Sequence, residues 1–494
     1  MITQSWLPLL VLLTSLLSGL IIFTLPEKSV RTRTTLNLLA AFSKVGLVSW
    51  MIWHIYQGQH YQIRIHFLPN IDLVLQMDPL AVLFVGLSAV LWLTTTFYAI
   101  GYLEGSPHRS RFFGFFSLCV AATAGVAMAG NLFTFLIFYE LLTLTAYPLI
   151  VHRGTEAARK AGQTYLVYTV GGGVLLLAGT AWLHTLTGTL DFTPQGFVQQ
   201  LPSELHPQLI VIFILLIMGV GVKATLVPLH GWLPQAMVAP APVSALLHAV
   251  AVVKAGVFGI VRVLYNVYGI DFAAALGITF PLMVLAAITI IYSSLRALTQ
   301  DDLKRRLAFS TVSQVSYITL GVALAGPISA IGGLVHLVHQ GLMKITLFFC
   351  AGNIAETLGI HKISEMKGVG RRMPLTMTAF TLTALGMIGV PPIAGFISKW
   401  YLGMGALQSG HAWVIGVLIV STLLNAAYFL PILYTAWFDQ PDTEQTAHPE
   451  TSHLLLWPPV ITALLSLAAG LFAALPYTPL EWARFIVSFE FLQR

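Results

Sequence analysis

Long apolar segments separated by short polar ones form the most regular pattern in the chain. A membrane-spanning helix needs about 20 mostly apolar residues. Segments of this kind recur about fourteen times, at 5–24, 36–56, 79–101, 112–129, 131–151, 162–186, 207–238, 241–266, 272–294, 304–325, 327–355, 374–408, 413–437 and 455–476. The pattern predicts an all-α polytopic membrane protein with about 14 transmembrane helices in a single membrane domain, residues 1–494.

Spans 7 (207–238) and 12 (374–408) are too long for one straight helix. Pro228 and Pro234 interrupt span 7, and Pro391-Pro392 interrupts span 12. Because proline removes a backbone donor and breaks helices, both spans are predicted to be broken helices.

Broken helices at membrane depth survive only where protein or a water-filled cavity satisfies the freed backbone groups. In transporters they often mark the ion path at matching positions of two inverted repeats. The spacing of the two breaks predicts two inverted five-helix repeats, spans 4–8 (residues 112–266) and spans 9–13 (residues 272–437).

Two polar connections have patterns of their own. Between spans 2 and 3, residues 57–78 contain two alternating stretches around Pro69-Asn70, which predict a small β-hairpin on the membrane surface. The stretch from Asp439 to His453 is polar and acidic, and we expect a solvated loop there.

Lysine and arginine are distributed unevenly among the loops. Loops after even-numbered spans carry only Arg64 and Arg262. Loops after odd-numbered spans carry Lys28, Arg31, Arg33, Arg109, Arg111, Arg153, Arg159, Lys160, Arg296, Lys304, Arg305, Arg306, Lys362, Lys367, Arg371 and Arg372. Because basic loops stay on the cytoplasmic side, both termini are predicted to lie outside or in the periplasm, with the chain in the cell inner (plasma) membrane.

Composition supports a membrane protein and excludes several classes. Hydrophobic residues make up 57% of the chain and charged residues 9%, whereas soluble domains carry about 25% charged residues. The net charge of +6 comes from short loops and does not indicate nucleic-acid binding. Cys119 and Cys350 both lie in apolar segments, so no disulfide framework is implied. The first apolar run lacks a charged leader and a cleavage site, and we interpret it as a retained span.

Ionisable residues inside spans are costly and therefore indicate function. They are Glu140, Lys223, Lys254, Lys344 and Lys399, with Lys44 in span 2 and the histidines His230, His248, His336 and His339. Burial favours the neutral form of lysine, so a nearby carboxylate can decide whether a lysine holds or releases a proton. Breaking a buried Lys/Glu pair costs about 3–5 kcal/mol, which is enough to couple successive proton steps.

In span 11, His336, Gln340 and Lys344 follow an i, i+4, i+8 spacing. They form one polar stripe about 12 Å long, which could carry a wire of water molecules. Structural alternatives remain open. Glu140 and Lys223 as an ion pair would fix helix register, and buried histidines can simply bond a carbonyl. For Lys44 we expect a structural role or a side chain that reaches the membrane surface.

Three motifs resemble a known family. They are Lys223-Ala-Thr-Leu-Val-Pro-Leu-His-Gly-Trp-Leu-Pro234 with Ala239-Pro-Ala-Pro-Val-Ser-Ala-Leu-Leu-His248, then Asp302-Leu-Lys-Arg-Arg-Leu-Ala-Phe-Ser310, and Gly389-Val-Pro-Pro-Ile-Ala-Gly-Phe-Ile-Ser-Lys399. Over nearly the whole chain they are similar to the antiporter-like subunits of Mrp-type cation/proton antiporters, of the membrane arm of respiratory complex I and of membrane-bound hydrogenases.

The resemblance implies fourteen helices in two inverted repeats and a proton relay. It implies that Glu140 pairs with Lys223, that Lys254 or His248 bridges, that His336 and Lys344 form the centre, and that Lys399 gates one exit. Chain length and the Phe-Ile-Ser-Lys399 form are most similar to the D-type subunits of the Mrp antiporters.

We therefore expect a proton-translocating subunit of a multisubunit Na⁺/H⁺ antiporter, with partner membrane subunits and no metal or organic cofactor. The main alternative is a proton-pumping subunit of a complex I-like or hydrogenase-like redox enzyme, whose redox centres would lie in other chains. A haem-binding electron carrier is disfavoured because His336 and His339 share one helix. An ordinary solute carrier is disfavoured by the buried lysines.

Overall fold

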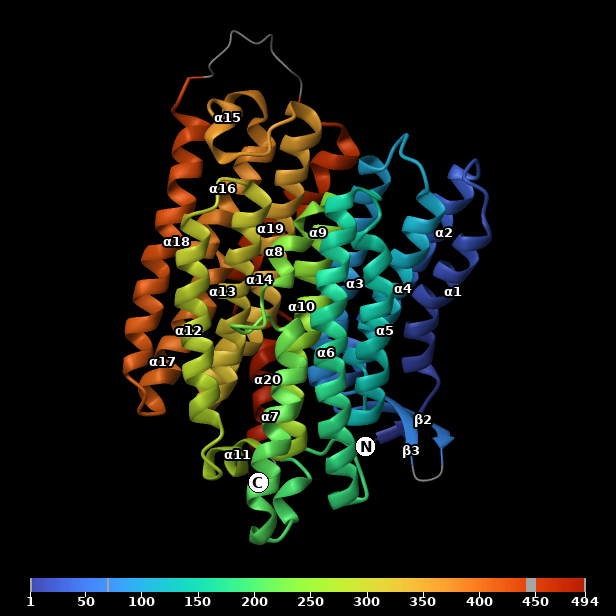
Figure 1. The fold of residues 1–494 in the computed structure, drawn as a ribbon, viewed down its shortest axis with the longest axis vertical. Helices are drawn as coiled ribbons and strands as arrows, with labels where there is room; N and C mark the ends of the chain where they lie inside the picture. The colour runs from blue at the N-terminus through green and yellow to red at the C-terminus, as the bar shows by residue number, and fades with distance from the viewer. Residues whose placement is uncertain (1, 69–70, 441–449, 493–494) are drawn as a thin grey trace.

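Helices account for most of the chain and run along one common direction (Figure 1). The computed structural model describes residues 2–68, 71–440 and 450–492. Figure 1 places both ends of the chain at the same end of the bundle. The predicted all-α polytopic architecture is confirmed.

The elements of the first half surround the N-terminal sheet and the first helix break. They are β1 (Ile2–Gln4), α1 (Leu7–Thr24), α2 (Val30–Tyr56), β2 (His60–Leu68), β3 (Ile71–Met77), α3 (Pro79–Tyr102), α4 (Arg109–Ala127), α5 (Leu132–Ile150), α6 (Glu156–Thr187), η1 (Val198–Gln200), η2 (Ser203–Leu205), α7 (His206–Lys223), α8 (Trp232–Gln235), η3 (Ala236–Val238), α9 (Ala241–Ala245), η4 (Leu246–Val250), α10 (Val252–Arg262) and η5 (Val263–Tyr268).

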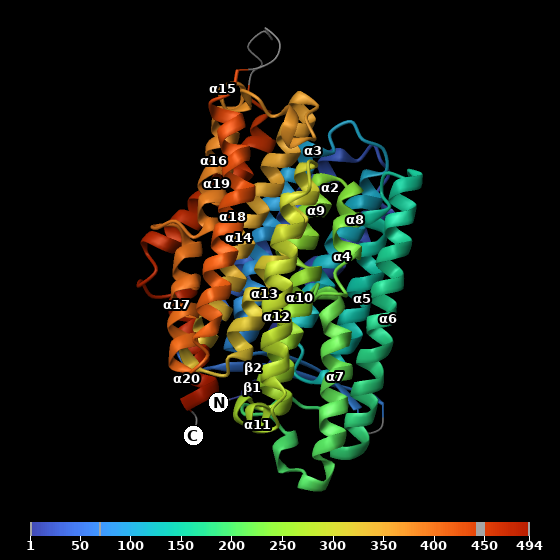
Figure 2. The same cartoon turned by 60° about the vertical axis from the view of Figure 1, so that its left-hand side comes forward.

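The second half contains the longest buried helix and the second break. Its elements are α11 (Ile270–Ala275), α12 (Thr279–Leu298), α13 (Leu303–Ala323), α14 (Pro327–Leu358), η6 (Ile363–Glu365), α15 (Val369–Arg372), α16 (Pro374–Ile388), α17 (Ala394–Gln408), α18 (Trp413–Trp437), α19 (His453–Leu471) and α20 (Pro479–Leu492). Figure 2 shows α10, α13 and α14 in the middle, between α17 on one side and α6 on the other.

Within the described residues, 12 helical stretches are long and apolar enough to cross a membrane. The other two predicted spans correspond to α13, which is rich in hydroxyl residues, and to the interrupted pair α16 and α17. The count of fourteen and the two inverted repeats remain predictions.

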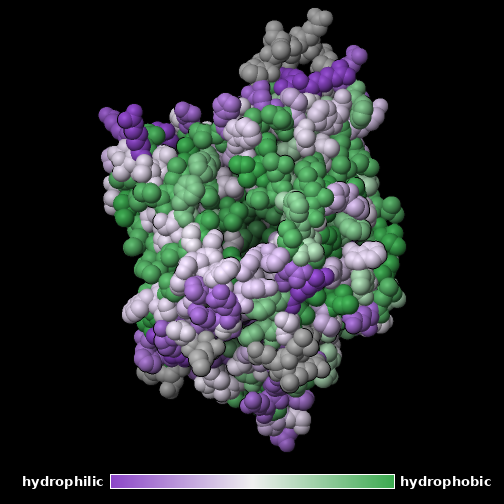
Figure 3. Space-filling view, turned by 180° about the vertical axis from the view of Figure 1, so that it is seen from behind, coloured by the Kyte–Doolittle hydropathy of each residue, from purple (hydrophilic) through white to green (hydrophobic). Residues whose placement is uncertain are grey.

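The surface is that of a protein surrounded by lipid. In Figure 3, hydrophobic residues spread over the middle of the molecule and hydrophilic ones gather toward its two ends. Large apolar side chains that point outward include Val167, 73% exposed, and Leu423, 65% exposed. Such a surface is stable only in an apolar solvent.

Both predicted breaks are confirmed. Helix α7 ends at Lys223, and an irregular stretch precedes α8. The indole Nε1 of Trp232 donates to the carbonyl of Val222 at 2.8 Å, so the break satisfies one backbone group that the helix leaves free. Helix α16 ends at Ile388 and α17 begins at Ala394.

The predicted hairpin is also confirmed, with β2 and β3 antiparallel. Pro69 and Asn70, around which it was predicted, lie outside the described residues. The sequence did not indicate β1, which pairs with β2 in parallel, or α20, which follows the last predicted span. The acidic loop lies mostly outside the described residues, but Glu450 accepts hydrogen bonds from Leu375 N and the Thr376 hydroxyl.

Some predicted boundaries differ from the structure. Span 8 was predicted as one helix, but it contains two π-helical segments, η4 and η5, on either side of α10. Span 9 was predicted to begin at 272, whereas α12 begins at Thr279 after the short α11. Gly277 adopts φ +74° between these two helices, a conformation that favours glycine and ends α11.

Candidate functional site

A set of polar side chains crosses the buried middle of the bundle from α5 to α17. We call Glu140, Lys223, Lys254, Gln340, Lys344 and Lys399 the polar row. Lys223, Lys254, Gln340 and Lys344 are completely buried. Glu140 and Lys399 at the two ends are partly buried. Five helices, α5, α7, α10, α14 and α17, contribute to it.

At the first end, Lys223 is the last residue of α7. Its ammonium group donates to the backbone carbonyl of Tyr139 and lies 3.4 Å from the centroid of the Tyr139 ring. Glu140 is the next residue, but the described residues show no ion pair between it and Lys223. One carboxylate oxygen, Oε1, is buried without a hydrogen-bond partner. The predicted direct pairing therefore remains a prediction.

Glycines make room for this end of the row. A Cβ atom on Gly173 of α6 would lie 2.4 Å from Oε1 of Glu140. A Cβ on Gly256 of α10 would lie 2.1 Å from the backbone nitrogen of Ala224, directly after Lys223. Real Cβ atoms do not approach other atoms so closely. At Gly256 the obstacle is backbone, so this position requires glycine, whereas at Gly173 the Glu140 carboxylate would have to move aside.

Lys254 connects α10 to α14. Its ammonium group donates to the carbonyl of Leu337 at 2.7 Å and to the side-chain oxygen of Gln340. The neighbouring His248 is completely buried and stacks near Phe348, with ring centroids 4.4 Å apart. Neither of its ring nitrogens has a hydrogen-bond partner among the described residues.

The polar stripe of α14 is fully buried. His336 Nδ1 shares a hydrogen bond of 2.7 Å with Ser398 Oγ of α17, whereas Nε2 has no described partner. Both ring nitrogens of His339 and the amide nitrogen of Gln340 also lack described partners. Buried polar groups in proteins normally bond to protein or to ordered water. These groups therefore form a polar interior suited to bound water.

From Lys344 onward, hydrogen bonds between side chains form a directed chain. Lys344 donates to Ser310 Oγ at 2.7 Å. Ser310 and Tyr428 Oη lie 2.8 Å apart, and Tyr428 donates to Asn425 Oδ1 at 2.5 Å. Because Tyr428 uses its proton toward Asn425, Ser310 must donate to Tyr428. Lys344, Ser310 and Tyr428 therefore each donate a hydrogen bond to the next group, in the direction of Asn425.

Lys399 meets the end of that chain at the second helix break. It donates to the carbonyls of Ile388 at 2.6 Å and Met387 at 3.2 Å, which α16 leaves free, and to Thr422 Oγ1 at 3.1 Å. Asn425 Nδ2 donates to the same Met387 carbonyl at 3.2 Å. Lys344 and Lys399 are thus connected through protein groups alone.

Two ionisable residues lie apart from the polar row. His230 packs against Tyr292, with ring centroids 5.4 Å apart. Lys44 is buried, donates to Ser15 Oγ at 2.7 Å and lies 5.1 Å from the Trp92 ring centroid. The expectation that Lys44 reaches the membrane surface is wrong, because its neighbours enclose it.

Tyr428, Asn425 and Ser398 belong to the site but were not predicted. In the sequence, Ser310 stood out only as the last residue of the motif that begins at Asp302. Nothing in the sequence distinguishes Tyr428 from the other tyrosines, because its role comes from which face of α18 packs on α13. Among the described residues, no group of three or more His, Cys, Asp or Glu side chains could hold a metal ion.

A family comparison identifies this architecture. Residues 129–425 match the model of the family "NADH:quinone oxidoreductase/Mrp antiporter, TM". The chain belongs to this family. The match extends from just before α5 into α18, so it contains every residue of the polar row.

Individual relatives come from two kinds of complex. The N-type subunit of the NADH-quinone oxidoreductase of Desulforudis audaxviator is 38% identical over 376 residues, covering 75% of this chain and 74% of the relative. The D-type subunit of the Na⁺/H⁺ antiporter of Bacillus subtilis is 29% identical over 401 residues, covering 81% and 80%. A chain of the membrane-bound sulfane sulfur reductase, an archaeal respiratory membrane complex, has the same fold, with a TM-score of 0.88, 24% identity and 98% of both chains covered.

Proposed function

We propose that this protein is the proton-translocating subunit of a multisubunit Na⁺/H⁺ antiporter. Protons would move along the polar row, from Glu140 and Lys223 through Lys254 to Lys344 and Lys399. The directed hydrogen-bond chain from Lys344 through Ser310 and Tyr428 to Asn425 is the observation that carries this proposal. Exchange of donor and acceptor roles at Ser310 and Tyr428 can carry a proton from Lys344 as far as the Tyr428 hydroxyl. Because the Asn425 amide and the Met387 carbonyl do not take up protons, the proposal assigns the last step toward Lys399 to bound water beside these groups.

The buried lysines act as switches in this proposal. An ammonium group without a carboxylate partner in a low-dielectric interior is costly, so its charge depends on nearby charges. The unpartnered carboxylate oxygen of Glu140 lies one residue from the carbonyl that holds Lys223. Movement of either side chain would change the charge of the other and start transfer toward Lys254.

A second candidate is a proton-pumping subunit of a redox complex. The relative with 38% identity is a NADH-quinone oxidoreductase subunit, and the similar solved fold comes from a respiratory complex. In this case electron transfer in partner chains would drive the same polar row. In both cases the protein works with other membrane subunits.

Inverted vesicles that contain the whole native complex test the proposal. Proton movement on addition of Na⁺ is compared between the native chain, Glu140→Ala and Lys223→Ala, each checked for assembly. Each change removes one proton-accepting group from the proposed relay, and a positioned acid or base contributes at least about a hundredfold to a proton-transfer step. We therefore expect at least about a tenfold loss in both variants. The matched controls Glu104→Ala and Lys28→Ala change the same residue types at exposed positions and should keep full activity.

The outcomes separate the candidates. Full activity in both buried variants would contradict the proposed relay. Proton pumping on addition of an electron donor, with no response to Na⁺ in the native complex, would favour the redox candidate.

A further inference from the structure

A polar cavity of about 390 Å³ lies at the end of the bundle where α6 begins and α14 ends. Its volume is within the range of small-molecule sites, about 300–1,000 Å³. The cavity is separate from the polar row. Its walls come from α3, α6, α13 and α14, from the connection between α5 and α6, and from the short segments α8, η3 and α9.

Basic side chains dominate this cavity. Arg153, Lys160, Lys304 and Arg305 line it together with His361, whereas Asp302 is the only acidic residue in the lining. One oxygen of Asp302, Oδ1, already accepts a hydrogen bond from the backbone nitrogen of Arg305 at 2.8 Å. Outside the lining, Glu156 pairs with Lys160 at 2.7 Å and Glu356 lies near Lys304. The four lysine and arginine side chains still exceed these three carboxylates by one, so the cavity keeps a net positive charge that favours an anion.

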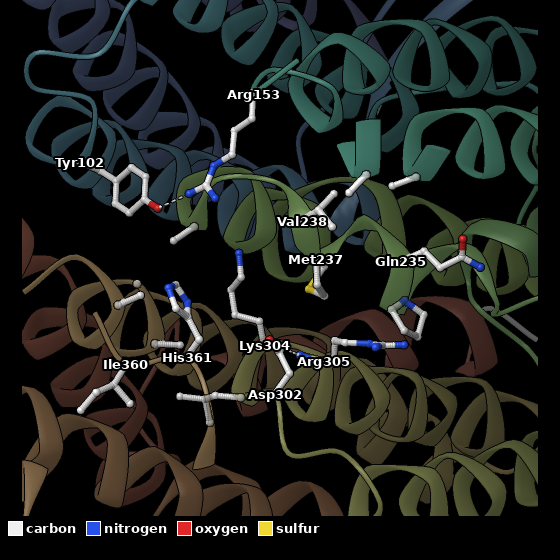
Figure 4. A pocket seen from close by; sticks show the side chains of 18 of the residues that line it. Tyr102, Arg153, Gln235, Met237, Val238, Asp302, Lys304, Arg305, Ile360 and His361 are labelled. Carbon is white, nitrogen blue, oxygen red and sulfur yellow. Dashed lines mark hydrogen bonds between the residues drawn. The ribbon is translucent and has the colours of Figure 1, made fainter. Parts of the chain in front are cut away.

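The cations at its centre hold no carboxylate. In Figure 4, Arg153 enters from one side and Lys304 and His361 from the other, with their nitrogen atoms around one space. Arg153 donates to the hydroxyl of Tyr102 at 3.3 Å, and Lys304 donates to the carbonyl of Ala239 at 2.7 Å. Within the described chain, neither cation forms an ion pair, although Glu356 lies near both Tyr102 and Lys304. Both cations retain free donors for a ligand.

The remaining walls are apolar. Ala157, Ala161 and Met237 contribute to the lining. Val167, seven residues beyond Lys160 on α6 and about 10 Å away, is 73% exposed on the outer surface. The cavity thus combines phosphate-binding groups with an apolar wall beside the lipid-facing side of the bundle.

We propose that this cavity binds a phosphate-bearing anion, held by Arg153 and Lys304. Arginine presents a planar fork to phosphate oxygens, and lysine adds a point charge. Basic pockets between transmembrane helices on the cytoplasmic side bind phospholipid headgroups. The loops here are those predicted to be cytoplasmic, so an anionic phospholipid is the source that the position favours.

The test uses the native complex in phosphatidylcholine nanodiscs with a minor fraction of phosphatidylglycerol. Native mass spectrometry counts the phosphatidylglycerol molecules retained by the complex. The variant R153Q/K304Q is compared with R31Q/R159Q, which removes two exposed charges from the same face outside the cavity. Each cation contributes about 1 kcal/mol, so the cavity variant should bind roughly 30-fold more weakly than the native chain. The control variant should retain its lipid.

A second arm distinguishes the source of the phosphate. Inorganic phosphate is titrated into the complex in pure phosphatidylcholine nanodiscs and followed by ³¹P line broadening. If R153Q/K304Q loses phosphate binding and R31Q/R159Q keeps it, the site is supported and its ligand is a soluble phosphate. Equal lipid and phosphate binding in the cavity and control variants overturns it. If R153Q/K304Q does not assemble, the exposed Lys160→Gln variant tests the same cavity against Arg159→Gln.

Discussion

The two broken helices hold their lysines in different ways. At the first break, Lys223 has one backbone carbonyl and an aromatic ring as neighbours, and the adjacent carboxylate oxygen has no described partner. At the second, Lys399 has two carbonyls and a hydroxyl, and Asn425 ties the same carbonyl to a chain that reaches Lys344. In the proposed relay, the first end would change charge and the second end would pass that change on.

This difference predicts that the two ends respond differently to small changes. The first should be sensitive to the position of a single carboxylate. The second should be sensitive to the loss of a single hydroxyl proton, because its groups act in series.

The largest effect is expected from Gly173→Ala. The added methyl group collides with Oε1 of Glu140 and displaces the carboxylate. Gly171→Ala is the matched control, because a Cβ there meets nothing within 4 Å. Both changes raise helix propensity by about 1 kcal/mol, so the control removes this contribution from the comparison. We expect about tenfold slower proton movement in vesicles for Gly173→Ala only, and equal rates would contradict the role of Glu140.

A smaller effect is expected from Tyr428→Phe. The change removes the proton that Tyr428 donates to Asn425 and leaves the ring in place. A neutral hydrogen bond contributes about 1 kcal/mol, so proton movement should slow about fivefold. Tyr434→Phe on the same helix is the control, because Tyr434 is 61% exposed. An unchanged rate in Tyr428→Phe would mean that the second end does not act in series.

The sequence predicted the spans, both breaks and most of the polar row, because an apolar run, a mid-span proline and a buried charge are local signals. It could not predict Tyr428, Asn425 or the bond from Lys223 to the Tyr139 carbonyl. These depend on how each helix is rotated against its neighbours, which packing decides. Helix α20 was missed for another reason. Its 14 residues are too few for a membrane span, which was the pattern searched for.

The smallest effect is expected in α20. This helix packs against α14, which lies between the two ends of the polar row. Glu490 is buried at 8% exposure, and Asn266, directly beyond α10, donates to it. Burial, with Asp78 nearby, raises the pKa of Glu490 to about 7. The folded state therefore favours the protonated form. This stabilisation is complete below about pH 4.3, the ordinary glutamate value, and is lost as the pH rises through 7.

Hydrogen exchange of residues 479–492 at pH 5.5 and 8.5 measures this dependence. After correction for intrinsic exchange rates, α20 should open more readily at pH 8.5, by up to about 2 kcal/mol. Glu490→Gln should remove the difference, because its side chain stays neutral. An identical pH response in Glu490→Gln would assign the effect to another group. Since α20 contacts α14, which lies between the two ends of the row, both ends should be affected equally.

Trp482 of α20 donates its indole proton to the carbonyl of Pro79 at 2.8 Å, joining positions 403 residues apart. Ribosomes add about 5–20 residues per second, so Pro79 waits roughly 20–80 s for this partner. During that time the start of α3 and the buried Arg262–Asp78 ion pair lack their final cover. Docking of α20 is therefore a late step, which covers the start of α3 only after the helices between the two have been made.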